Sequence, residues 1–339
     1  MHVHNLPGDI LVLVLEKTVG ASDDIAHRFK STVPLLSVCQ RWRCVALPMA
    51  YNKLYVRYGA VPNLVSGTYS CYVAASEPTD VVVATNLDLI VAAGCVHMVR
   101  TAKIDVHFVA NPFPGFKCII RRMSAAANNW RILSLSVAMH PDTFRFNSEY
   151  VDMDKHADDI AEIGGAIATL LPKLRNLECG GASRNCFART LYGHIAGLYT
   201  EQLRSINSQH PIYLPQNRRL RALNNVHIEY VHGINHRLPN MESGELVSLS
   251  LFDGPPNHSW APFSTDSSSR VIEFTNLRKL RVMYGEVYKD QGVAVHQADG
   301  HPWELRLPSL AHLEISSVEG ICPLLEYAVL PPNMESIYI

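Results

Sequence analysis

The chain has 339 residues, of which 47% are hydrophobic and 18% are charged, and its formal net charge is −1. This length is enough for one large or two ordinary domains, and the apolar fraction is normal for a globular protein. The near-neutral charge excludes a global electrostatic field that would attract nucleic acid or an anionic membrane, so neither is expected as a partner.

The start of the chain also carries no export or membrane signal. The longest apolar run near the N-terminus, residues 10–15, is too short for a membrane span and lacks the basic start of a signal peptide. The eight cysteines form no CxxC pair and no dense framework, which is typical of reduced thiols. We therefore expect an intracellular protein, located in the cytoplasm, the nucleus or both.

Three short helices are predicted in residues 1–52. Pro7 suits the first turn of a helix because proline has no N–H to leave unpaired there, and residues 10–15 follow with helical spacing. A second helix is predicted from about residue 23 to 36 and a third from 38, with Pro48 ending it. Three such helices enclose little interior, so their apolar surface must be covered by the following domain or by a partner.

Two stretches in this region, LPGDILVLVL (6–15) and LLSVCQRWRCVA (35–46), resemble the two halves of an F-box. That pattern has Leu-Pro, an acidic residue and Ile-Leu, followed later by Val-Cys and Trp. The resemblance implies docking on the Skp-type adaptor of a cullin–RING ubiquitin ligase. The adaptor-binding residues that it implies are Leu6, Pro7, Ile10, Leu11, Val14, Leu36, Val38, Cys39 and Trp42. The alternative is that these residues simply cover the core of the following domain.

After a segment at 53–94 that we interpret as a link or an N-terminal cap, a degenerate repeat runs to the last residue. Its pattern is apolar-x-x-apolar-x-apolar, with a weak first copy at 99–104. The stronger copies are WRILSL (130–135), LRNLEC (174–179), LRSINS (203–208), LRALNN (220–225), LVSLSL (246–251), LRKLRV (277–282), LAHLEI (310–315) and MESIYI (334–339). Amphipathic helical patterns precede the early copies, and loops precede the later ones. Units of this kind bury their apolar faces by stacking into a parallel sheet.

This repeat resembles a divergent leucine-rich repeat. The expected fold class is α/β: an F-box-like three-helix module at 1–52, the segment 53–94, and an irregular leucine-rich-repeat solenoid (a horseshoe with a parallel sheet) at 95–339. The combination implies a substrate receptor of an SCF (Skp–cullin–F-box) ubiquitin ligase, with the repeats holding the target. Because the last copy stops in mid-strand, we expect either a C-terminal truncation or a partner that shields this strand.

Arginines recur at one position of the repeat, directly after the first apolar residue. Stacked parallel strands would line them up, and their guanidinium groups could clamp an acidic or phosphorylated target segment. The candidate target contacts are Arg131, Arg175, Arg204, Arg221, Arg278 and Arg281. The alternative is a row of solvated basic residues without a partner.

Motifs of catalysis are missing from the sequence. It has no GxxxxGK[ST], GxSxG, HExxH or GxGxxG, and its cysteines and histidines lack metal-site spacing. We therefore expect no catalytic residue, no cofactor and no metal, and interpret the chain as a non-catalytic ligase subunit. The alternative function is a leucine-rich-repeat interaction scaffold that works outside any ligase.

Overall fold

The structure is a computed structural model of the 339-residue chain. It describes residues 6–19, 31–59, 82–107, 113–128, 130–139, 156–181, 186–209, 212, 214, 218–229, 241–252, 271–284, 304–317 and 328–338. The beginning of the predicted second helix, at residues 20–30, lies outside this part of the chain.

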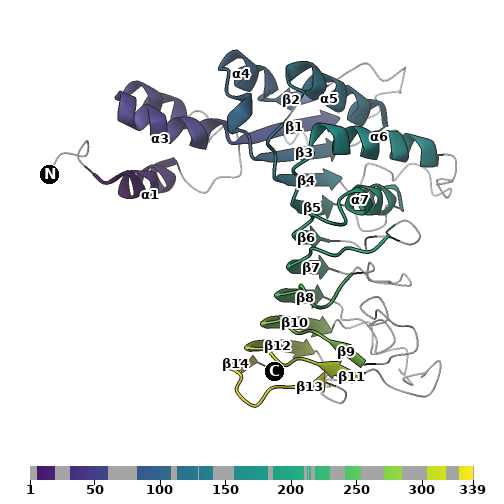
Figure 1. Ribbon diagram of the computed structural model, residues 1–339. Helices are drawn as coiled ribbons and strands as arrows, with labels where there is room; N and C mark the ends of the chain where they lie inside the picture. Colours follow the sequence, from purple (N-terminus) through teal and green to yellow (C-terminus); the bar gives the residue numbers. More distant parts are fainter. Residues whose placement is uncertain are drawn as a thin grey trace, which may run out of the picture.

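One long sheet dominates the described residues, and its strands are stacked in a single column (Figure 1). Its eleven strands follow the order β14-β12-β10-β8-β7-β6-β5-β4-β3-β1-β2. All neighbours pair in parallel except β1 and β2, which are antiparallel. The strands are β1 (Lys53–Gly59), β2 (Val82–Thr85), β3 (Thr101–His107), β4 (Ser134–Met139), β5 (Asn176–Gly181), β6 (Ser205–Ser208), β7 (Asn225–Glu229), β8 (Ser248–Phe252), β10 (Lys279–Tyr284), β12 (His312–Ser317) and β14 (Ser336–Tyr338). The predicted α/β class is confirmed.

The segment at 53–94 takes part in this sheet. It contributes β1, which pairs in parallel with β3, and β2, which forms the antiparallel edge. Asn86, directly after β2, is bound to β1: its Oδ1 accepts a hydrogen bond from the Tyr55 N–H at 2.9 Å, and its Nδ2 donates to the Lys53 carbonyl at 2.9 Å.

A second, three-stranded parallel sheet was not predicted. It consists of β9 (Val271–Glu273), β11 (Glu304–Arg306) and β13 (Ala328–Val329). Each of these strands precedes one of the last three strands of the long sheet. The later units therefore pair short strands along the face that helices cover in the earlier units (Figure 1).

The repeat pattern determines the register of the long sheet. Parallel pairing aligns the second apolar position of each unit in one row, which is buried through most of the sheet. The row is Leu54, Ala102, Leu135, Leu177, Ile206, Val226, Leu249, Leu280, Leu313 and Ile337. The weak copy at 99–104 is confirmed as a unit, and residues 51–56 form one more that the sequence reading missed.

Two of the predicted copies have the wrong register. The unit on β4 is ILSLSV (132–137) rather than WRILSL, and the unit on β7 is LNNVHI (223–228) rather than LRALNN. The reason is that Trp130 and Leu220 are also buried, one under the preceding helix and one in a bridge with Met241. A sequence pattern cannot distinguish a buried residue of the turn from the first buried residue of the strand.

Helices cover one face of the sheet from β1 to β6 (Figure 1). They are α4 (Leu87–Ala92), η3 (Val96–Met98), α5 (Phe113–Ala126), α6 (Ala157–Leu170) and α7 (Cys186–Leu198). Their apolar stripes pack on the inward side chains of the strands and form one continuous core that extends to the last units.

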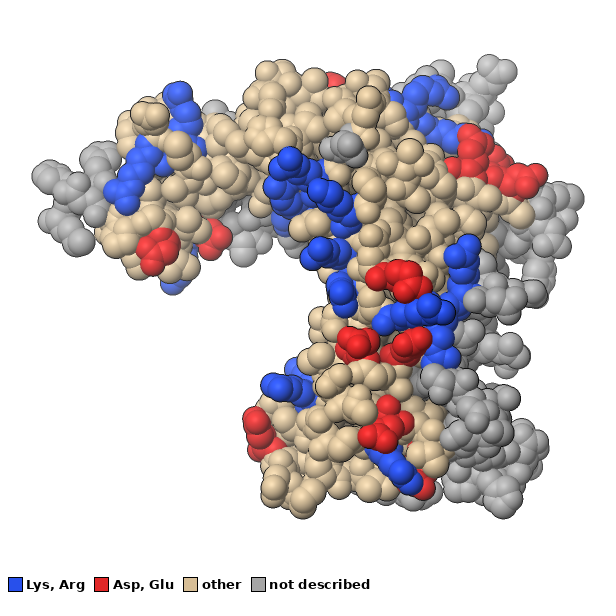
Figure 2. All heavy atoms as spheres, viewed as in Figure 1, with Lys and Arg blue, Asp and Glu red and all other residues tan. Residues whose placement is uncertain are grey.

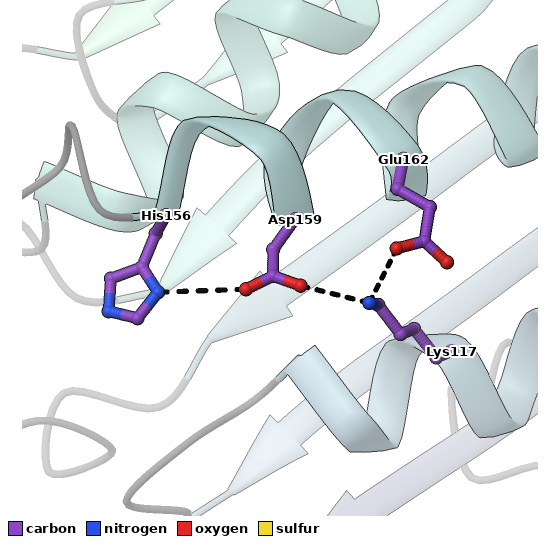
Figure 3. A network of polar contacts seen from close by, with 4 residues as sticks. All are labelled: Lys117, His156, Asp159 and Glu162. Carbon is purple, nitrogen blue, oxygen red and sulfur yellow. Dashed lines mark hydrogen bonds and ion pairs between the residues drawn. The ribbon is translucent and has the colours of Figure 1, made fainter.

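A polar network on the outer surface joins α5 to α6 (Figure 3). Lys117 Nζ lies 2.9 Å from Asp159 Oδ1 and 2.5 Å from Glu162 Oε2, and His156 Nδ1 lies 3.7 Å from Asp159 Oδ2. The hydrogen bonds that Lys117 donates to Glu162 and Asp159 raise the pKa of Lys117, and the same bond to Asp159 lowers the pKa of that carboxyl group. Because these groups are solvated, the network contributes little to the stability of the fold.

The N-terminal helices project sideways from the upper end of the sheet (Figure 1). They are α1 (Gly8–Val19), the 3-10 helix η2 (Val33–Ser37) and α3 (Gln40–Tyr51), and α3 leads directly into β1. The prediction that Pro48 ends the third helix is wrong, because α3 continues through it to Tyr51. The carbonyl that loses its partner belongs to Cys44, which is exposed, so water can satisfy it.

Candidate partner-binding surfaces

The first candidate surface lies on the projecting N-terminal helices. They have a small core of their own, in which Leu11, Leu15 and Ala46 are at most 1% exposed. The partly buried side chains that pack against it are Leu35, Leu36, Trp42, Val45 and Met49. Two arginines tie the helices together, because Arg41 Nη2 donates to the Leu6 carbonyl and Arg43 Nε donates to the Leu36 carbonyl at 3.0 Å.

Among the described side chains of this module, four large apolar ones are exposed. Ile10 is 39% exposed, Leu13 is 54%, Val14 is 38% and Val38 is 46%. They are named the apolar patch below. Three of them lie on α1, on the turns that also carry the buried Leu11 and Leu15, so α1 has apolar residues on its outer side as well as on the side facing α3. Such a helix leaves apolar area uncovered unless a partner binds.

The predicted adaptor-binding residues therefore divide into two groups. Ile10, Val14, Val38 and Pro7 are exposed, whereas Leu6, Leu36, Cys39 and Trp42 are half-buried. Leu11 belongs to the core of the module and is not accessible to a partner. Leu13 was not among the predicted residues, yet at 54% it is more exposed than Ile10 and Val14. The available signal was the unbroken apolar run at residues 10–15, because six consecutive helical residues cover more than one face of a helix.

The second candidate surface is the edge of the long sheet where its parallel strands begin. From β3 to β14, the residue before each strand of the long sheet donates its N–H to the carbonyl of the equivalent residue in the preceding unit, and the ladder begins at the Asn52 carbonyl before β1. These residues are named the edge row below: Asn52, Arg100, Leu133, Arg175, Arg204, Asn224, Val247, Arg278, Ala311 and Glu335. The first residues of the strands form the adjacent face row: Lys53, Thr101, Ser134, Asn176, Ser205, Asn225, Ser248, Lys279, His312 and Ser336.

The structure brings together only some of the predicted target contacts. Arg175, Arg204 and Arg278 lie in the edge row. Arg131 lies two residues before that row and Arg221 lies three residues before it, because the register of these two predicted copies was wrong. Arg221 also has acidic neighbours, since it lies 3.4 Å from Glu201 and 3.7 Å from Glu242.

Two further findings complete the arginine set. Arg281 lies further along β10 and pairs with Glu314 at 2.9 Å, so its charge is already matched. Arg100 is in the edge row and was missed, although the weak copy at 99–104 contains it directly after its first apolar residue.

A polar cluster occupies the outer face of β1 and β3, beyond these rows. The Tyr55 hydroxyl donates to Asp105 Oδ2 at 2.9 Å, Lys103 Nζ lies 4.0 Å from Asp105 Oδ1, and the Arg57 guanidinium carbon lies 5.4 Å from the Tyr55 ring centroid. Burial and the negative charge of Asp105 raise the pKa of Tyr55 to about 12. Tyr55 is therefore a neutral hydrogen-bond donor at physiological pH.

Within the described ranges, no group of three or more His, Cys, Asp or Glu side chains could hold a metal ion. In the same part of the chain, no helix has the length and hydropathy needed to cross a bilayer. The two surfaces therefore present exposed apolar side chains on the N-terminal helices and arginine side chains at the start of the strands.

Comparison of the chain with family models, with curated protein sequences and with solved structures finds no match.

Proposed function

We propose that the chain is the substrate-recognition subunit of an SCF-type ubiquitin ligase. In this proposal the N-terminal helices are an F-box that docks a Skp-type adaptor, and the parallel sheet is a divergent leucine-rich-repeat solenoid that holds the target protein. The chain itself performs no catalysis, because other subunits supply the activated ubiquitin.

The observation that carries the proposal is the apolar patch on a module that projects away from the sheet. Ile10 and Val14 belong to the F-box-like stretch 6–15, and Val38 belongs to the second stretch, 35–46. All three are exposed while Leu11 and Leu15 hold the helices together. If the helices served only to cover the neighbouring core, their apolar residues would be expected to face that core. Leu36, Leu47 and Ala50 do so, but the apolar patch does not.

The sheet supports the second half of the proposal. Its outer face is free of described helices from β1 to β14, and the helices pack on the other face (Figure 1). A long solvent-facing sheet with many small polar side chains is typical of a protein-binding surface in repeat proteins.

The test is co-expression with a Skp-type adaptor, followed by co-purification and a measured Kd. The triple variant Ile10→Ala, Val14→Ala, Val38→Ala should lose about 3 kcal/mol or more of binding free energy, which is over a hundredfold in Kd. Leu11→Ala is not a suitable probe, because it removes a core side chain and should destabilise the module by about 2–5 kcal/mol.

The matched control is Leu89→Ala with Val91→Ala on α4, since these side chains are 49% and 43% exposed and lie outside the N-terminal module. This variant should bind the adaptor as the wild-type chain does. A folded wild-type chain that ignores the adaptor would contradict the proposal and favour the non-ligase scaffold.

A further inference from the structure

Positive charge is concentrated where the strands of the long sheet begin. The edge row and the face row together contain six lysines and arginines, and their single acidic residue, Glu335, lies beside the last strand. The basic residues are Lys53, Arg100, Arg175, Arg204, Lys279 and Arg278. The chain as a whole carries a net charge of −1, so this edge differs clearly from the average surface.

The arginines of the edge row are accessible. Arg100, Arg175, Arg204 and Arg278 are exposed, and none of them forms an ion pair with another described residue. Two of them are held in place by neutral groups: Arg100 Nη1 donates to the His97 carbonyl at 2.8 Å, and Arg204 Nη1 donates to the Ala222 carbonyl at 3.2 Å. Figure 2 shows Lys and Arg atoms as a band along the start of β3 to β6, below the projecting helices.

The spacing of these charges selects the shape of the ligand. Arg100 lies on the unit of β3 and Arg204 on the unit of β6, three strand steps apart, which is about 14 Å at the usual strand spacing. A single phosphate is bound by guanidinium groups that converge on it. A row spread over three strand steps instead matches several anionic groups spaced along an extended chain.

The face row adds neutral hydrogen-bonding groups beside the arginines. Thr101, Ser134, Asn176 and Ser205 follow one another across β3 to β6, and Asn176 Nδ2 donates to Ser134 Oγ at 2.8 Å. Hydroxyl and amide groups of this kind can donate to the backbone carbonyls of a peptide. No Phe, Tyr or Trp lies in either row of the described strands, so the stacking platform that single-stranded nucleic acid needs is missing there.

We propose that this edge binds an extended, Asp- and Glu-rich segment of the target protein, which crosses the strands from β3 to β6 with its carboxylates on Arg100, Arg175 and Arg204. This inference rests on the proposed function in one respect: it takes the sheet as the surface that holds the target. It adds the chemistry of the target segment, which is acidic.

The experiment measures the binding of a fluorescein-labelled oligoglutamate peptide to the full chain by fluorescence anisotropy, at low and at raised NaCl. An oligoglutamine peptide and a single-stranded oligonucleotide are the comparison probes. We expect oligoglutamate to bind more tightly than both, and its affinity to fall as salt screens the charges.

The variant Arg175→Glu with Arg204→Glu should weaken oligoglutamate binding at least about tenfold, because two attractive contacts become repulsive. Arg121→Glu with Arg306→Glu makes the same change in net charge outside the two rows and should leave the affinity almost unchanged. Glu178→Gln removes an exposed acidic side chain two residues along from Asn176 on β5 and should tighten binding.

The milder pair Arg175→Gln with Arg204→Gln, checked by circular dichroism and thermal melting, keeps the test valid if charge reversal prevents folding. Three results would each overturn the inference. They are an equal loss of oligoglutamate affinity in the edge-row and control variants, tighter binding of the oligonucleotide than of oligoglutamate, and an oligoglutamate affinity that does not respond to salt. Adaptor binding is not involved, so this result and that of the co-purification test are independent.

Discussion

At the scale of single residues, the polar cluster on β1 and β3 shows how a buried charge is accommodated on a sheet. Asp105 is 7% exposed; it accepts a hydrogen bond from the Tyr55 hydroxyl of the neighbouring strand and lies 4.0 Å from Lys103 Nζ of its own strand, while Arg57 lies over the Tyr55 ring. A buried carboxylate is costly unless donors and positive charges accompany it. The Tyr55 hydroxyl supplies the donor, and the negative charge of Asp105 in turn opposes ionisation of the Tyr55 phenol.

This arrangement predicts a pH dependence. Since the pKa of Tyr55 is raised from 10.0 to about 12 in the folded chain, its contribution to stability is fully present below pH 10 and is lost as the pH rises toward 12. Asp105→Asn should lower the pKa of Tyr55 toward 10.0, though not fully, because burial is the larger cause.

The ¹³Cζ chemical shift of Tyr55, followed by NMR against pH, measures this change. Asp88→Asn, which alters an exposed carboxylate paired with Arg122, is the control and should have no effect on Tyr55. An unaltered Tyr55 titration in the Asp105 variant would disprove the assigned coupling.

At the scale of helices and strands, the helix layer depends on close approach between neighbours. Two consecutive glycines of α6 differ in their surroundings. A Cβ at Gly164 would lie 2.3 Å from the Cδ2 of His194 on α7, whereas a Cβ at Gly165 would meet nothing within 4 Å. Gly164 thus allows α6 and α7 to pack closely, and Gly165 has no such role.

The two positions should therefore respond in opposite directions to alanine. Gly164→Ala should destabilise the chain by about 1–3 kcal/mol, because the His194 ring must move out of a packed position. Gly165→Ala should stabilise it by about 0.5–1 kcal/mol, the ordinary gain for alanine inside a helix. Urea denaturation of both variants tests this, and the pair provides its own control. Similar effects at both sites would show that the helices are not in close contact at Gly164.

At the scale of the whole molecule, the described chain contains two apolar cores of very different size. One extends continuously from β1 to the last strands, and the other consists of three buried side chains in the N-terminal helices with a few partly buried neighbours. A core that small contributes little free energy. The N-terminal helices should therefore open without unfolding of the sheet.

Hydrogen exchange of the full chain measures this difference. Amides of α1 should exchange more than about tenfold faster than those of β3 to β7, since local opening requires less free energy than global unfolding. If the N-terminal helices dock an adaptor as proposed, bound adaptor should slow exchange in α1 and leave β5 to β7 unchanged. Equal protection of α1 and the central strands in the free chain would contradict the picture of two separate cores.

Much of this architecture could be predicted from the sequence because it follows from periodic burial. The α/β class, the parallel sheet and the helices over its first half were all readable from apolar spacing, as in Leu174, which precedes β5, and Leu177 and Cys179, which lie on it. The N-terminal helices were readable from the same kind of spacing.

Other features were decided only by the tertiary structure. The sequence did not fix the register of the units on β4 and β7, because Trp130 and Leu220 are buried although they lie before the strands. A buried residue before a strand and a buried residue within it look the same in an apolar pattern. The division of α1 into a core side with Leu11 and an outer side with Leu13 required the position of α3. Which arginines share one edge was fixed by strand pairing, which joins Arg100 to Arg175 and Arg204 across 75 to 104 residues of sequence. Spacing along a chain reports which side chains are buried, but the neighbours of each side chain are set by contacts between distant segments.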